Sequence, residues 1–108
     1  MVKGWFIGHF EPSILKTDQF EVGVLQRKKG GEEPHYHAVA TEYNILLSGN
    51  LTLSGESILP GDIFVIEPNE IVYPFYHEDS TILCVKTPSI PNDKFNPWNS
   101  IEHETKSI

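Results

Sequence analysis

The sequence predicts an all-β fold, either a sandwich or a barrel, and three observations support this prediction. Glycine and proline number eight each among 108 residues, so few windows are long enough for a stable helix. Runs rich in β-branched and aromatic residues recur along the chain, and turn-forming residues separate them. About eight short strands spread over about 90 residues are typical of these two architectures. The length allows one domain with its own core.

The expected strands follow one another with little space between them. The first lies at residues 5–10 (WFIGHF), and the second, at 19–26 (QFEVGVLQ), shows the alternation of a strand. A turn rich in glycine and charge follows at 28–34 (KKGGEEP). The remaining strands are expected at residues 35–40, 42–49, 50–53, 56–60, 61–68, 71–77 and 81–88. A hairpin turn joins the strands at 50–53 and 56–60, and a turn at 78–80 (EDS) precedes the last strand.

The composition changes after Pro88. Residues 89–108 contain several prolines and asparagines and show no alternation of apolar and polar residues. We therefore expect residues 1–88 to form a single barrel. We expect residues 89–108 to form a C-terminal tail that packs on the barrel through Phe95 and Trp98, or is loose near its end.

Charge and hydropathy exclude several classes of partner. The formal net charge of −7 repels phosphate backbones, so we expect no nucleic-acid partner. No stretch approaches the roughly 20 apolar residues of a membrane span, and Gly8 and His9 interrupt the N-terminal apolar stretch. The single cysteine, Cys84, lies in an apolar run and is expected to be a buried small hydrophobic residue. We expect a soluble, cytoplasmic protein with no membrane partner.

Residues 34–44 (PHYHAVATEYN) hold two of the five histidines, His35 and His37, and a carboxylate, Glu42. On a helix the two histidines would point about 200° apart, whereas on a strand they share one face. Neutral imidazoles are common metal ligands, and a carboxylate completes a mixed nitrogen and oxygen set. Glu42 would face the other way on a straight strand, so a bend is needed at residues 38–41, where Ala38 and Ala40 are small. The alternative is a solvated face with a surface charge.

The stretch HYHAVATEYNILLSG (residues 35–49) resembles the first motif of the cupin superfamily. That motif has two histidines one residue apart, then a glutamate and, six residues later, a glycine, which is Gly49 in this chain. Residues 61–70 (GDIFVIEPNE) resemble the start of the second cupin motif, a strand that begins with glycine and ends in a proline turn. The resemblance implies a double-stranded β-helix (jelly-roll) cupin barrel with a metal in its mouth. Glu42, Asn44 and Leu46 would face inward.

The second cupin motif normally ends in a third histidine, which this chain lacks. Val72 takes its place when Asn69, which tolerates the left-handed backbone conformation, stands for the family's glycine, and Tyr73 takes it when the alignment slips by one residue. Three alternatives follow. His35, His37 and Glu42 hold a divalent transition metal (Fe, Mn, Zn or Ni) alone, Tyr73 or His77 supplies a fourth ligand, or the metal is lost and the pocket binds a small molecule directly.

The resemblance implies two main classes of function. The first is a metal-dependent enzyme, of dioxygenase or isomerase type, acting on a small polar molecule, with Tyr73 or His77 as candidate catalytic acid or base. The alternative is a non-catalytic module that binds or senses a sugar or a carboxylate, and a purely structural role is a third possibility.

A homodimer is expected from the outward face of the strand at 42–49. Tyr43, Ile45 and Leu47 alternate with the inward residues and form an apolar row that should not remain in water. Either the chain's own ends or a second copy could cover this row. Symmetric pairs are the commonest oligomers, and small cupins, which this chain resembles, often pair sheet to sheet.

Overall fold

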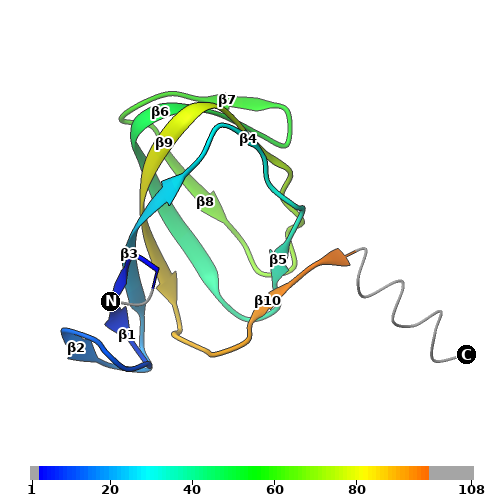
Figure 1. Ribbon diagram of the computed structural model, residues 1–108. Coiled ribbons are helices and arrows are strands. Elements are labelled where there is room, and N and C mark those ends of the chain that lie inside the picture. The colour runs from blue at the N-terminus through cyan, green and yellow to red at the C-terminus, as the bar shows by residue number, and fades with distance from the viewer. Residues whose placement is uncertain (1–2, 98–108) are drawn as a thin grey trace, which may run out of the picture.

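The computed structural model describes residues 3–97, and the all-β prediction is confirmed (Figure 1). No helix in this part of the chain is long and apolar enough to cross a membrane. The strands are β1 (Trp5–Gly8), β2 (Leu15–Lys16), β3 (Glu21–Arg27), β4 (Gly30–Gly31), β5 (Tyr36–His37), β6 (Thr41–Leu53), β7 (Glu56–Ile58), β8 (Ile63–Ile66), β9 (Pro74–Thr87) and β10 (Lys94–Phe95).

Eight of the strands form one sheet in the order β2-β1-β3-β9-β6-β7, with β4 also paired to β9 and β8 also paired to β6. Strands β5 and β10 make a separate two-stranded sheet. The two long strands, β6 and β9, run antiparallel at the centre and curve, so that the sheet folds over a shared interior (Figure 1). The jelly-roll prediction fits this architecture, although the hydrogen-bonded order of the described strands is open and does not close into a ring.

The predicted breaks at residues 49–50 and at 78–80 are wrong, because β6 and β9 run straight through them. Both strands bend there together. Gly49 has φ of 106°, and a Cβ atom at that position would lie 2.1 Å from the Ser80 Oγ. The register between β6 and β9 shifts on both sides of Gly49, and Ser80 Oγ accepts a hydrogen bond from the Asn50 amide at 3.2 Å. These turn-forming residues therefore serve a bulged bend and not a chain reversal.

Two other predicted elements are shorter or of a different kind. The strand expected at 35–40 is regular only at Tyr36–His37 and bends at 38–39, and the turn expected at 28–34 contains β4, which pairs with β9. The hairpin of β6 and β7 is confirmed, with Leu51 opposite Ile58 and a tight turn at Ser54 and Gly55, both with positive φ.

The interior is filled by alternate residues of the long strands. Glu42, Asn44 and Leu46 are buried whereas Tyr43 and Leu47 are about half exposed, which confirms the predicted alternation along β6. Ile45, the third residue of the predicted outward row, is half-buried. Cys84 is buried, as expected. The apolar core consists of Leu25, Leu46, Leu51, Ile58, Tyr76, Ile82 and Cys84, with Trp5, Leu53 and Phe64 packed against it.

The outer face of β6 and β8 remains apolar and uncovered within the described chain. Tyr43 and Leu47 of β6 are 48% and 49% exposed, and Ile63 and Val65 of β8 are 72% and 43% exposed. Strand β1 cannot cover this face from its place in the sheet, because β3 and β9 lie between it and β6. Of the two tail aromatics, Phe95 stacks on Tyr36 of β5, and Trp98 lies outside the described residues.

Candidate metal centre

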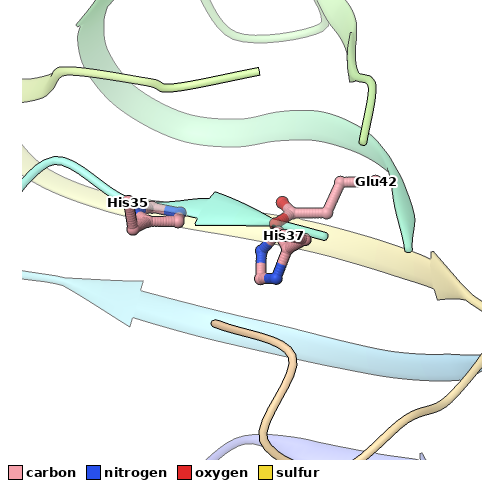
Figure 2. A group of neighbouring side chains, drawn as sticks. All are labelled: His35, His37 and Glu42. Carbon is pink, nitrogen blue, oxygen red and sulfur yellow. Dashed lines mark ion pairs between the residues drawn. The ribbon is translucent and has the colours of Figure 1, made fainter. Parts of the chain in front are cut away.

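Three side chains from neighbouring segments come together at one end of the interior. His37 ends β5, His35 lies just before that strand, and Glu42 lies at the start of β6. One ligand atom of each residue lies within 4.8 Å of those of the others. Figure 2 shows the Glu42 carboxylate above the His37 ring with His35 alongside. The bend predicted at 38–41 occurs at residues 38–39, and it brings Glu42 to the side of the two histidines.

His37 lies between two hydrogen-bond acceptors. Its Nδ1 is 2.8 Å from the backbone carbonyl oxygen of Asp93, and its Nε2 is 2.5 Å from the Glu42 Oε2. A carbonyl oxygen can only accept, so Nδ1 donates to it. Nε2 faces Glu42 and is the ring nitrogen left to bind a metal ion.

Glu42 is held in its ionised form. Burial alone would raise the pKa of this carboxyl, but the hydrogen bond and positive charge of His37, with the charge of Lys86 and a hydrogen bond from Asn44, bring the pKa down to about 2. The Asn44 Nδ2 donates to the Glu42 Oε1 at 3.2 Å, and the Cys84 thiol donates to the same oxygen at 3.5 Å. The carboxylate is thus both charged and fixed in orientation.

His35 is held in its neutral form. Burial lowers the pKa of this imidazole, and the nearby charge of Lys94 lowers it further. The ring lies edge-on to His37, with the two ring centroids 5.5 Å apart. A neutral imidazole with an available lone pair is the form that binds metals.

A cavity of about 130 Å³ opens beside these three residues. Its apolar wall is formed by core residues of β3, β6, β8 and β9, among them Leu25, Leu51, Phe64 and Ile82. Its polar wall carries three cations and a further carboxylate, Arg27, Lys86, Lys94 and Glu32.

Each of these cations has a carboxylate partner. Arg27 Nε lies 3.2 Å from the Glu32 carboxylate and Lys94 Nζ lies 4.0 Å from it, while Lys86 Nζ lies 3.5 Å from Glu21. Lys86 also lies 5.0 Å from the centre of the Trp5 ring. The carboxylate contact of each lysine is single and 3.5 Å or longer, in contrast to the 3.2 Å contact of Arg27.

The structure separates the two alternatives for the missing third histidine. Val72 is 1% exposed, lines the cavity, and pairs with His35 through two backbone hydrogen bonds of 3.0 and 3.3 Å. Asn69 has φ of 67°, as the alignment with Val72 at the histidine position requires. Tyr73 is 50% exposed and does not line the cavity. Val72, and not Tyr73, therefore faces the site.

His77 also lies away from the group of three. Tyr76 of β9 faces the cavity, so the next residue, His77, points outward, where its Nε2 lies 2.6 Å from the Thr52 hydroxyl. Tyr73 and His77, our candidates for a fourth ligand or an acid–base group, are therefore not brought to the site. Alternation along the chain places both on the outer surface.

The sequence motifs do not include the charged residues of the cavity or Asp93. Arg27 and Lys86 could have been found, because each lies two residues beyond an inward-facing residue, Leu25 and Cys84 respectively. A charge at an inward position of a strand is the signal. Glu32 lies in a stretch whose composition predicts a turn, and Asp93 lies in the part of the chain that shows no pattern.

Solved structures with the same fold were found by comparison. No protein-family model matches the chain, and no curated protein matches it. An uncharacterised Klebsiella pneumoniae protein with a double-stranded β-helix domain is 20% identical with a TM-score of 0.65, over 77% of this chain and 74% of that one. A cupin-2 domain protein from Shewanella frigidimarina is 20% identical with a TM-score of 0.59, over 68% and 76% respectively.

A third structure is that of an enzyme. Lactobacillus farciminis oxalate decarboxylase, in a complex with formate, is 15% identical with a TM-score of 0.68, over 80% of this chain and 29% of that one. The chain therefore spans less than a third of this enzyme. These similarities show that the chain has the cupin fold, as the sequence motifs implied.

Proposed function

We propose that this chain, which has the cupin fold, binds a divalent transition metal through His35, His37 and Glu42. The observation that carries the proposal is the convergence of their three ligand atoms within 4.8 Å beside a cavity. Two imidazoles and one carboxylate leave coordination positions open, which suits Fe, Mn, Zn or Ni. The donor set is prepared for a metal, since Glu42 is ionised and His35 is neutral.

We propose further that the chain is a metal-dependent enzyme acting on a small polar molecule, of dioxygenase or isomerase type. When bound, the metal would polarise a substrate oxygen as a Lewis acid. The residues of the chain would exclude water, orient the metal ligands and bind the substrate. The apolar wall excludes water from the cavity, Asn44 and Asp93 hold Glu42 and His37 in orientation, and the cations of the polar wall bind the ligand.

The charges of the cavity favour a carboxylate over a neutral sugar as the ligand. The charges of Arg27, Lys86 and Lys94 are balanced by Glu32 and Glu42 in the cavity and by Glu21 beside Lys86, so a divalent metal would leave an excess of two positive charges. An excess of positive charge in a small, partly apolar cavity attracts an anion with a short carbon skeleton. This excess is notable because the chain as a whole carries a net charge of −7.

The alternative function is a non-catalytic module that binds a small carboxylate. The placement of Tyr73 and His77 on the outer surface favours it, because neither can act as an acid or base in the cavity. Metal content separates the two functions. Near-stoichiometric metal, measured by plasma mass spectrometry on protein purified without chelating resin, supports the enzyme, and protein that neither contains nor takes up metal supports the binding module.

We also propose that the protein is a homodimer in the cytoplasm. The uncovered apolar face of β6 and β8 supports the dimer. A single free cysteine and an acidic composition are compatible with the cytoplasm. Sedimentation equilibrium and cell fractionation test these two proposals.

A further inference from the structure

Asp93 contacts the proposed metal centre through both its side chain and its backbone, although it belongs to no sequence motif. It lies in the segment after β9, between Pro88 and β10, and is 7% exposed. Its carboxylate accepts hydrogen bonds from the amides of Ala38, Val39 and Ala40 at 2.9 to 3.2 Å. Its backbone carbonyl accepts the 2.8 Å hydrogen bond from His37.

We propose that Asp93 is the positioning residue of the metal centre, which it assembles by clamping the bend at 38–40 and aiming the His37 ring. The inference rests on the proposed metal site and extends it to a residue more than fifty positions away in the sequence.

The clamp decides whether Glu42 joins the two histidines. The three amides lie between His37 and Glu42, and an extended chain there would leave Glu42 on the opposite face from His37. A single carboxylate accepts from three amides in succession, and the hydrogen bond from Ala40 is buried whereas those from Ala38 and Val39 are partly buried. The bent conformation therefore depends on this side chain, since no strand pairing is present at 38–40 to hold it.

The carbonyl of Asp93 decides where the His37 ring points. By accepting from Nδ1, it fixes the proton on that nitrogen and turns Nε2 towards Glu42 and the proposed metal position. The carbonyl is itself held in place, because the next residue, Lys94, pairs with His37 across β10 and β5. Phe95 stacks on Tyr36 at a centroid distance of 5.5 Å in the same two-stranded sheet.

A purely structural role makes a different prediction. Asp93 is outside the apolar core, which β3, β6, β7 and β9 build without the C-terminal segment. If Asp93 only stabilised the fold, its loss would lower the unfolding midpoint and leave the metal affinity of the folded protein unchanged. If it positions the site, the affinity falls in protein that is fully folded.

The test measures Zn²⁺ and Mn²⁺ affinity by calorimetric titration for the wild type, Asp93→Ala and Asp93→Asn. We expect Asp93→Ala to weaken affinity by roughly 10- to 100-fold, as loss of a group that orients a ligand does elsewhere, and Asp93→Asn to weaken it less. The matched control is Asp79→Ala, because the Asp79 carboxylate also accepts a backbone amide, that of Lys29 at 2.8 Å, but lies outside the cavity. If the alanine variant does not fold, the asparagine variant is compared with the same control.

A second measurement needs no metal and so separates failure of this inference from failure of the proposed function. Nitrogen-15 NMR of the metal-free protein reports the imidazole nitrogens of His37 directly. We expect a hydrogen-bonded Nδ1 proton in the wild type. Asp93→Ala keeps the backbone carbonyl but frees the bend at 38–40 that follows His37, so the Nδ1 signal should shift or broaden by exchange. Metal affinity within about twofold of wild type, or an unchanged His37 signal, overturns the proposal. A wild type that binds no metal overturns the metal site, and the His37 signal then decides the role of Asp93 alone.

Discussion

At the start of β6, polar side chains are buried on the inner face and apolar side chains are exposed on the outer face, which is the reverse of the usual arrangement. The inner face begins with Glu42 and Asn44, which are polar yet 9% and 4% exposed, whereas the outer face carries Tyr43 and Leu47, which are apolar yet about half exposed. Buried polar groups and uncovered apolar patches are the two observations that most often mark function. The inner face thus indicates a site that holds a ligand, and the outer face indicates a surface that meets a partner.

The two faces also differ in whether other residues of the chain pair with their polar groups or cover their apolar ones. On the inner face Glu42 has partners in His37, Asn44 and Cys84, so the buried charge is compensated. On the outer face nothing in the described chain covers Ile63 or Val65. Substitutions on one face can therefore be compared with matched substitutions elsewhere on the surface.

The largest effect is expected from removing both imidazoles. The double variant His35→Ala, His37→Ala should lose metal altogether. It should still fold, because the core around Leu46 and Leu51 is untouched, but its unfolding midpoint should fall because the buried Glu42 carboxylate loses its His37 partner. His77→Ala is the matched control, since this histidine lies on the outer surface beside Thr52. Plasma mass spectrometry and thermal unfolding measure both properties. Metal content retained in the double variant would place the metal elsewhere.

Acid should destabilise the metal-free protein through Glu42. Its pKa is about 2 when folded and 4.5 as the ordinary value, so the unfolded chain takes up the proton first as pH falls. The stability that the ionised carboxylate contributes is therefore complete above about pH 4.5 and is lost towards pH 2, by up to about 3 kcal/mol.

His35 adds to this acid effect at higher pH. Its lowered pKa means that stability begins to fall once pH drops below 6.5, the ordinary value of an imidazole. Urea unfolding at a series of pH values measures both effects. Glu42→Gln should flatten the lower part of the profile, and Glu56→Gln, a change of an exposed carboxyl on β7, should not. An identical profile for Glu42→Gln and wild type would argue against the ion pair with His37.

On the outer face, Ile63→Glu should weaken the dimer by about 2 kcal/mol or more, because a charge would be buried without a partner. The control is Ile14→Glu, which changes a residue that is equally exposed, at 70% against 72%, but lies beside β2 and away from β6 and β8. Sedimentation equilibrium at micromolar concentration measures association. A wild type that sediments as a monomer would remove the dimer, and equal effects of the two changes would move the interface away from β8.

The smallest effect is expected from restoring the third histidine of the cupin motif. Val72→His should raise metal affinity by roughly tenfold, since Val72 lines the cavity beside His35 and a further imidazole would complete the ligand set. Tyr73→His adds the same side chain one residue later, on the outer surface, and should leave the affinity unchanged. Titration with Zn²⁺ compares the two. A gain in Tyr73→His alone would show that the register of this segment is shifted by one residue.

Local patterns predicted the inner face of β6 well and the rest of the site poorly. Strand alternation predicted that His35 and His37 share one face, and small residues allowed a bend after them. The convergence with Glu42 was predicted from the resemblance to the first cupin motif. Asp93 could not be predicted, because its contacts join segments that are 53 to 56 residues apart and nothing in its own neighbourhood shows a periodicity.

The long strands were misinterpreted for a different physical reason. Gly49 and the polar residues at 78–80 have the composition of turns, but they allow two paired strands to bend together without ending. Composition reports that the backbone departs from a straight strand, and only the pairing partner decides whether the chain reverses or continues. Once β6 and β9 are paired along their whole length, continuation is the only outcome.

The central claim is that His35 and His37 bind the same metal ion together with Glu42, and pulsed electron paramagnetic resonance of the Mn²⁺-loaded protein tests it most directly. We expect nitrogen couplings from two imidazoles, which fall to one in either His35→Ala or His37→Ala when Mn²⁺ is supplied in excess. A spectrum with no nitrogen coupling, like that of hydrated Mn²⁺ held only by carboxylates, would contradict the proposed metal centre.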